Sequence, residues 1–146
     1  MIKPTLLYTD EKPQYATKLR YSGPCCGVVA VFDCLGGVSY REVWAHMGRN
    51  KGNAWKGRTD LDEVMGALRH FGARFTEMAG RDCRGSLATW IDQHTRPGRI
   101  YLVRVGGHFL TVKDGKVWDQ THAAIPVEHA KGLKRKRVTH AIEITT

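Results

Sequence analysis

The amino-acid sequence predicts a single α+β domain, because helical signals dominate its first two thirds and strand signals dominate its last third. Helix caps and apolar stripes recur up to residue 94, whereas residues 100–120 show the two-residue period of β-strands. No strand-helix-strand alternation and no internal repeat is present, so we expect an antiparallel sheet after the helices. At 146 residues the chain has the length of one domain, which we expect to span residues 1–146.

The composition is that of a folded globular protein, with 42% hydrophobic and 25% charged residues. No apolar run approaches the roughly 20 residues that span a bilayer, and no signal-peptide pattern follows Met1. We therefore expect a cytoplasmic protein whose 4 cysteines are reduced. The net charge of +9 indicates attraction to acidic partners. Prolines and mixed charges predict an extended N-terminal arm over residues 1–20.

The first predicted helix carries two adjacent cysteines at its start. A Ser-Gly-Pro sequence at residues 22–24 offers a capping hydroxyl and a proline suited to the first helical turn. An apolar run at residues 28–32 follows, and two glycines at residues 36–37 end the helix. Cys25 and Cys26 are therefore expected at the N-terminus of a buried helix.

Caps, periodicity and turn signals predict the remaining elements. Capping boxes begin two amphipathic helices at Ser39 and at Thr59, and glycines at positions 48 and 72 end them. Asp114-Gly115 is a hairpin signal between two strands. The other predicted elements are a helix over residues 86–94 and strands over residues 74–78, 100–105, 108–113, 116–120 and 137–145.

Cys26 is the candidate nucleophile. The free N–H groups and the dipole of a helix N-terminus lower the pKa of a thiol, and they also favour the oxyanion of a tetrahedral intermediate. The alternative is that Cys25 and Cys26 are small buried hydrophobic residues, as most free cysteines are.

The predicted hairpin supplies a base for this thiol. With a two-residue turn, Leu110 faces Asp119 and His108 faces Thr121, so that His108 and Asp119 share one face as diagonal neighbours. Diagonal residues lie about 7 to 8 Å apart, within reach of a carboxylate–imidazole hydrogen bond. A three-residue loop with a bulge would instead bring Gln120 onto the face of His108.

These residues resemble the papain-like cysteine peptidase superfamily. Cys26-Gly27 on a helix, followed far downstream by Gly107-His108 and by Trp118-Asp119, reproduces its order of cysteine, histidine and aspartate. The chain is similar to the bacteriocin-processing peptidase domains of ABC transporters, and more similar still to small uncharacterised phage and plasmid proteins. The resemblance implies a papain-like fold in which the helix carrying the cysteine packs on the C-terminal sheet.

Two positions depart from the family pattern. Cys25 lies beside Cys26, so it is the alternative nucleophile as well as an auxiliary candidate. Arg20 stands where such enzymes usually have the glutamine of the oxyanion hole. Gln14 or Gln120 is the candidate replacement.

The resemblance implies a cysteine peptidase or related thiol hydrolase with a catalytic Cys26, His108 and Asp119. Peptide or isopeptide cleavage, deamidation and transfer to another amine all use the same acyl-enzyme. A protein or peptide substrate, no cofactor, and a phage or plasmid source acting in the cytoplasm of a bacterial host are expected.

Two other functions compete for these residues. A zinc site is disfavoured because the cysteines lack CxxC spacing and the histidines lack a His-x-x-x-His pair. A basic nucleic-acid-binding or host-protein-binding module with a vestigial triad is the second class. Its candidate residues are Lys131, Lys134, Arg135, Lys136 and Arg137.

Overall fold

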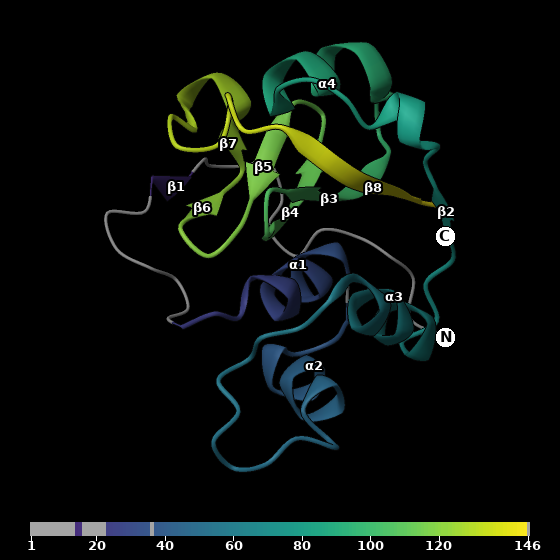
Figure 1. Ribbon diagram of the computed structural model, residues 1–146, viewed down its shortest axis with the longest axis vertical. Helices are drawn as coiled ribbons and strands as arrows, with labels where there is room; N and C mark the ends of the chain where they lie inside the picture. Colours follow the sequence, from purple (N-terminus) through teal and green to yellow (C-terminus); the bar gives the residue numbers. More distant parts are fainter. Residues whose placement is uncertain (1–13, 16–22, 36, 146) are drawn as a thin grey trace.

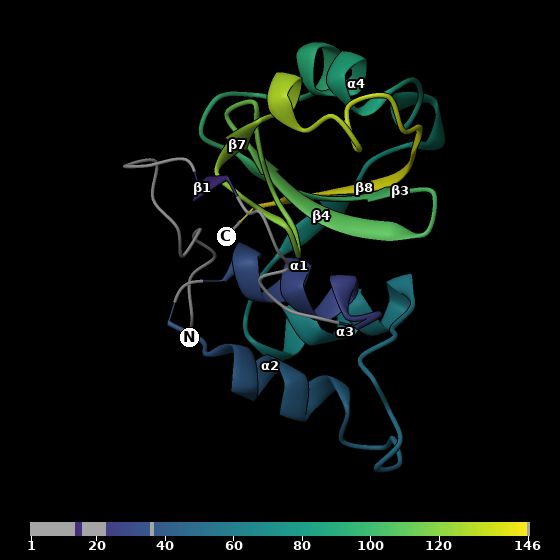
Figure 2. The same ribbon diagram turned by 90° about the vertical axis from the view of Figure 1, so that its left-hand side faces the viewer.

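The computed structural model describes residues 14–15, 23–35 and 37–145. A six-stranded antiparallel sheet of order β2-β8-β3-β4-β5-β7 lies between helices α1 to α3 on one face and α4 on the other (Figures 1 and 2). The α+β prediction is therefore confirmed. The strands are β2 (Phe75–Glu77), β3 (Ile100–Val105), β4 (His108–Lys113), β5 (Lys116–Trp118), β7 (Ile125–Pro126) and β8 (Val138–Ile144).

Helix α1 (Cys26–Cys34) lies at the centre of the larger core, and every residue from Gly27 to Cys34 is buried. Apart from Asp33 these residues are apolar or small, and the sheet, α2 and α3 cover them on all sides (Figure 2). The helix begins later than predicted. Its N-cap is Cys25, which makes no side-chain capping bond, so Pro24 precedes the helix instead of occupying its first turn. The predicted capping residue Ser22 lies outside the described residues.

The two amphipathic helices begin at capping boxes. Ser39 caps α2 (Tyr40–Met47) as predicted. The cap of α3 (Leu61–His70) is Asp60 and not Thr59, because the Asp60 carboxylate accepts the backbone N–H of Glu63 at 2.8 Å and Glu63 bonds back at 3.0 Å.

The β4–β5 hairpin has the predicted two-residue turn. Lys113 pairs with Lys116, and Asp114 and Gly115 adopt φ values of 50° and 77°. The ladder ends at Trp118, two residues before the predicted end of the strand. Asp119 leaves the sheet because its backbone N–H donates to the carbonyl of His122 at 3.0 Å.

Several short elements were not predicted. Strands β1 (Gln14–Tyr15) and β6 (His122–Ala123) form a separate two-stranded sheet. The rest of the predicted N-terminal arm lies outside the described residues. Single-turn 3₁₀ helices lie at Gly80–Asp82 (η1) and Val127–His129 (η2).

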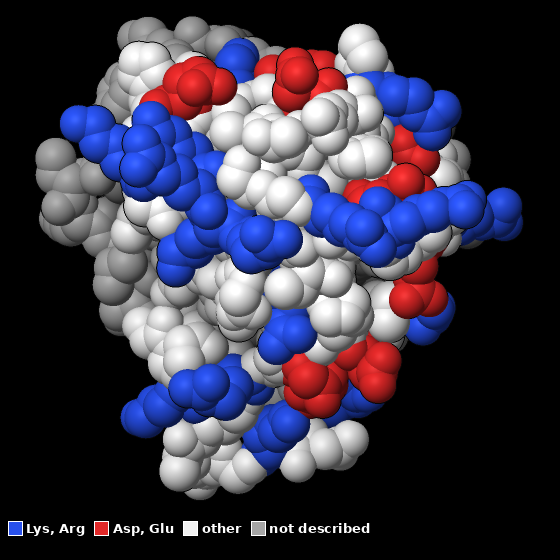
Figure 3. All heavy atoms as spheres, turned by 45° about the horizontal axis from the view of Figure 1, so that its top comes forward, with Lys and Arg blue, Asp and Glu red and all other residues white. Residues whose placement is uncertain are grey.

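The basic segment, residues 131–137, lies on the α4 side of the sheet. Its carbonyls at Lys134 and Lys136 accept the N–H groups of Ala88 and Leu87 at the start of α4 (Leu87–His94). Figure 3 shows Lys and Arg side chains gathered on the face that includes this side of the molecule. The segment is therefore fixed in the fold by its backbone, while most of its basic side chains are exposed.

Gly57 fixes the loop before α3 against the start of α1. Its φ is +103°, and a Cβ built there would lie 2.6 Å from Cβ of Cys25 and 2.9 Å from the Trp44 ring. Gly98 has a φ of +78° but no heavy atom within 4 Å of the corresponding position.

We predict that Gly57→Ala destabilises the protein by about 1 to 3 kcal/mol more than Gly98→Ala, because it adds a steric clash to the backbone strain that both substitutions introduce. Urea unfolding of the two variants measures the difference. Equal destabilisation would contradict the tight packing at Cys25.

Candidate functional site: a cysteine, a histidine and an aspartate at the end of the sheet

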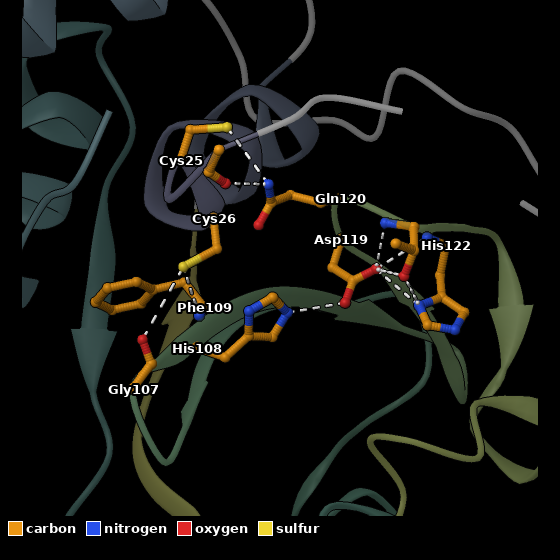
Figure 4. Close-up of polar contacts among 10 residues, drawn as sticks. Cys25, Cys26, Gly107, His108, Phe109, Asp119, Gln120 and His122 are labelled. Atoms are coloured by element: carbon orange, nitrogen blue, oxygen red, sulfur yellow. Dashed lines mark hydrogen bonds and ion pairs between the residues drawn. The ribbon is translucent and has the colours of Figure 1, made fainter. Parts of the chain in front are cut away.

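Cys26 lies where the first turn of α1 meets the start of β4 (Figure 4). The backbone N–H of Phe109 donates to the Cys26 sulfur at 3.5 Å, and the sulfur lies 4.0 Å from the carbonyl of Gly107. Of the 4 cysteines, all of them described, Cys26 is the one that is not buried. The structure therefore leaves the predicted nucleophile partly exposed and holds it against the β3–β4 turn and the start of β4.

The surroundings of Cys26 favour its thiolate. Burial raises the pKa of the thiol, but hydrogen bonds from His108 and from the backbone of Phe109, with the positive charge of His108, outweigh burial and lower it. Cys34 has the opposite environment, since burial raises its pKa to about 12. Burial also raises the pKa of Cys83.

His108 lies between Cys26 and Asp119 (Figure 4). Its Nε2 lies 2.8 Å from Oδ2 of Asp119, so the other ring nitrogen is left for the thiol. Burial lowers the pKa of His108, but the hydrogen bonds with Asp119 and then with Cys26 outweigh burial and raise it to about 9. An imidazolium beside a thiol of lowered pKa favours a thiolate–imidazolium pair.

The Asp119 carboxylate is buried, with 3% of the residue exposed. Burial by itself raises the carboxyl pKa, but hydrogen bonds from His108 and His122 lower it well below its usual range. Oδ1 also accepts the backbone N–H groups of Thr121 and His122, both at 2.9 Å. The turn after β5 therefore holds an ionised carboxylate against His108, although the predicted pairings of Leu110 with Asp119 and of His108 with Thr121 are not part of the observed ladder.

His122 is a contact of Asp119 that the sequence analysis did not assign to the site. Its Nδ1 lies 2.7 Å from Oδ1 of Asp119, whereas His108 contacts the other carboxylate oxygen, Oδ2. The Asp-x-x-His spacing is the sequence signal, because a turn that begins at an aspartate folds the third following residue back over its carboxylate.

Cys25 and Gln120 lie on the far side of Cys26 from His108. Cys25 is fully buried, and its sulfur lies 3.5 Å from Nε2 of Gln120. The same Nε2 donates to the carbonyl of Gly23 at 2.7 Å, while the amide oxygen points toward the side of Cys26 (Figure 4). In this orientation Gln120 offers an acceptor, and not a donor, to a group bound at Cys26.

The other auxiliary candidate is placed only by its backbone. Gln14 pairs with Ala123, next to His122 in β6. Arg20 lies outside the described residues. Over residues 14–15, 23–35 and 37–145, no group of three or more His, Cys, Asp or Glu side chains is arranged to hold a metal ion.

The fold defines the general class of the domain. Its helices and antiparallel sheet are similar in arrangement to a papain-like cysteine peptidase domain. The particular similarity is to a crystal structure of a double glycine motif protease from an AMS/PCAT transporter in complex with the leader peptide. The TM-score is 0.50 at 15% identity, over 100% of this chain and 99% of the other. No protein-family model and no curated protein matches the chain.

The predicted resemblance to bacteriocin-processing peptidase domains is therefore confirmed at the level of the fold. The similarity concerns the fold alone, and the transporter is named only in the description of the other protein. In the part of the chain that the structure describes, no helix has the length and apolar character needed to cross a bilayer.

We predict that iodoacetamide modifies Cys26 fastest among the 4 cysteines near pH 7. In His108→Ala the partner that lowers the thiol pKa is lost while burial remains, so labelling of Cys26 becomes at least about tenfold slower at pH 7 and recovers only in alkali. Mass spectrometry of the modified peptides over pH 5–10 measures both effects. Equal labelling of all thiols, independent of His108, would contradict the described electrostatics.

Proposed function

We propose that the protein is a cysteine hydrolase that cleaves peptide or isopeptide bonds. The observation that carries the proposal is the position of His108 between Cys26 and Asp119, with its Nε2 2.8 Å from Oδ2 of Asp119 (Figure 4). In this proposal Cys26 is the nucleophile, His108 is the general base and acid, and Asp119 orients His108. A second histidine, His122, positions Asp119 by a contact with Oδ1, the carboxylate oxygen that does not contact His108.

The reaction follows from the protonation states of the pair. The Cys26 thiolate attacks the carbonyl carbon, and the C=O electron pair moves to the oxygen, which the free N–H groups at the start of α1 stabilise. Collapse of this intermediate breaks the C–N bond, and the leaving amine takes a proton from the His108 imidazolium. Neutral His108 then accepts a proton from the water that attacks the thioester, which releases a carboxylic acid and restores the thiolate.

Two features widen this proposal without changing the site. The same residues can form an acyl-enzyme from a side-chain amide with release of ammonia, which is deamidation. An amine can also attack the acyl-enzyme in place of water, which transfers the acyl group. The solved neighbour is described with a leader peptide, which supports a peptide substrate for this chain too. A phage or plasmid source and action in a bacterial cytoplasm belong to the proposal on the ground of sequence resemblance.

We predict that Cys26→Ala lowers peptide turnover at least about 1,000-fold and that Asp119→Asn lowers it at least about tenfold with the fold retained. A proteome-derived peptide library with mass-spectrometric detection of new termini supplies the substrates. Cys83→Ala is the matched control and should cleave like the wild type, because Cys83 packs in the core on the α4 side of the sheet. Cleavage that persists in Cys26→Ala would overturn the assignment of the nucleophile.

A second candidate function is nucleic-acid binding by the basic segment defined above. Four of its five basic side chains are exposed and Lys134 is partly exposed. None of the five forms an ion pair with a carboxylate of the described residues. Since α4 and α1 lie on opposite faces of the sheet, an anionic partner bound here would not cover Cys26 (Figure 2).

We predict weak, sequence-independent binding of single-stranded or duplex DNA that falls steeply as salt increases. Replacing Lys131, Arg135, Lys136 and Arg137 by Gln should reduce the salt dependence together with the affinity, and should leave Cys26 labelling unchanged. Fluorescence anisotropy between 50 and 200 mM salt is the measurement. Nanomolar affinity at physiological salt, without thiol reactivity, would make binding the principal function.

A further inference from the structure

A row of three side chains crosses the sheet beside Cys26. Phe109 in β4 pairs directly with Arg104 in β3, and Arg104 pairs directly with His140 in β8. Directly opposite residues project from the same face of a sheet, with Cβ atoms about 5 Å apart. Phe109 belongs to the core around α1, so Arg104 projects from the face on which Cys26 lies.

Phe109 links this row to the nucleophile. Its backbone N–H bonds to the Cys26 sulfur at 3.5 Å, and its ring lies 3.4 Å from the position that a Cβ on Gly27 would occupy. The guanidinium carbon of Arg104 lies 5.8 Å from the centre of the same ring, within the range of a cation–π contact. Arg104 is therefore one cross-strand step from the residue that holds the thiolate.

Arg104 has no anionic partner in the described part of the protein. No carboxylate of the described residues forms an ion pair with it, and its Nε is buried without a hydrogen-bond partner. Buried N–H groups in native proteins are nearly always bonded. Arg104 is only partly buried as a residue, so a ligand can approach its side chain.

The backbone of β8 is irregular where it faces Arg104. The register between β3 and β8 shifts between Arg104 and Val105, so that Thr139 of β8 is the extra residue, and the Thr139 hydroxyl donates to the Arg104 carbonyl at 3.1 Å. Bulges of this kind recur next to active sites.

We propose that Arg104 binds a carboxylate of the substrate, on an acidic side chain close to the bond that Cys26 attacks. This inference rests on the proposed hydrolase function. A guanidinium binds a carboxylate through two parallel N–H···O bonds, and no carboxylate of the described residues pairs with Arg104. The substrate class is then an acidic peptide segment, bound on the opposite side of Cys26 from Asp119.

The first test uses two small thiol reagents, anionic iodoacetate and neutral iodoacetamide, with their rates at Cys26 normalised to those at N-acetylcysteine. Arg104→Gln should lower the iodoacetate-to-iodoacetamide ratio at least about threefold, because it removes a nearby positive charge. Arg104→Lys should retain the ratio. Arg84→Gln removes an exposed positive charge next to η1 and is the control, with an unchanged ratio.

The second test uses peptidyl acyloxymethyl ketones that carry Asp, Asn or Lys at each of the three positions before the ketone. The wild type should react at least about tenfold faster with Asp than with Asn at one position, and Arg104→Gln should lose that preference. Arg104→Glu should prefer Lys at the same position. The iodoacetamide rate of each variant reports whether its site is intact.

The outcomes separate this inference from the proposed function. An unchanged reagent ratio in Arg104→Gln, or a wild type that does not distinguish Asp from Asn at any position, would overturn the role of Arg104 while Cys26 remains reactive. If Cys26 reacts with no probe faster than Cys83, the hydrolase itself is rejected. If Arg104→Gln does not fold, the Asp and Asn probes on the wild type and the preference of Arg104→Glu for Lys still decide.

Discussion

Helix α1 has to be covered on all sides, and most of the architecture follows from that constraint. Its residues from Gly27 to Cys34 are buried, so it is sandwiched between the sheet and the α2–α3 pair. The first turn, however, is where the free N–H groups of a helix lie, and they cannot be buried without partners. Cys26 therefore lies at the boundary between the closed core and solvent. Its backbone is held by the buried helix, while its side chain remains accessible to a ligand.

The electrostatics of the site are a balance between burial and hydrogen bonding. Removing a carboxylate from water costs several kcal/mol unless its lone pairs are used. Asp119 meets that condition with His108 on one oxygen, and with His122 and two backbone N–H groups on the other. Burial lowers the pKa of His108, but hydrogen bonds with this carboxylate and with Cys26 raise it to about 9, and His108 in turn helps to lower the thiol pKa of Cys26 against the effect of burial. The protonation of these three groups is therefore linked.

The sheet separates two charged regions that have different environments. On the α1 side, Arg104 lies against an aromatic ring beside the thiol. On the α4 side, the basic segment is held by backbone hydrogen bonds, and its charges face solvent. The net charge of +9 is thus divided between at least two surfaces on opposite faces of one sheet. Composition alone reports only the total.

The sequence by itself determined the elements whose physics is local. Capping bonds span three residues, and a two-residue turn needs only Asp114 and Gly115, so the Ser39 cap and the β4–β5 hairpin were predictable. The hairpin also brought His108 and Asp119 into proximity, but the actual contact depends on the turn at Asp119, where a carboxylate competes with the ladder for backbone N–H groups. The start of α1 after Pro24 was missed because Cys25 packs against Gly57, 32 residues away in the chain, and a contact over that separation has no local signal. Tertiary structure alone placed Arg104 against Phe109, whose backbone N–H bonds to Cys26, since strand register, and not the sequence near either residue, decides which side chains meet.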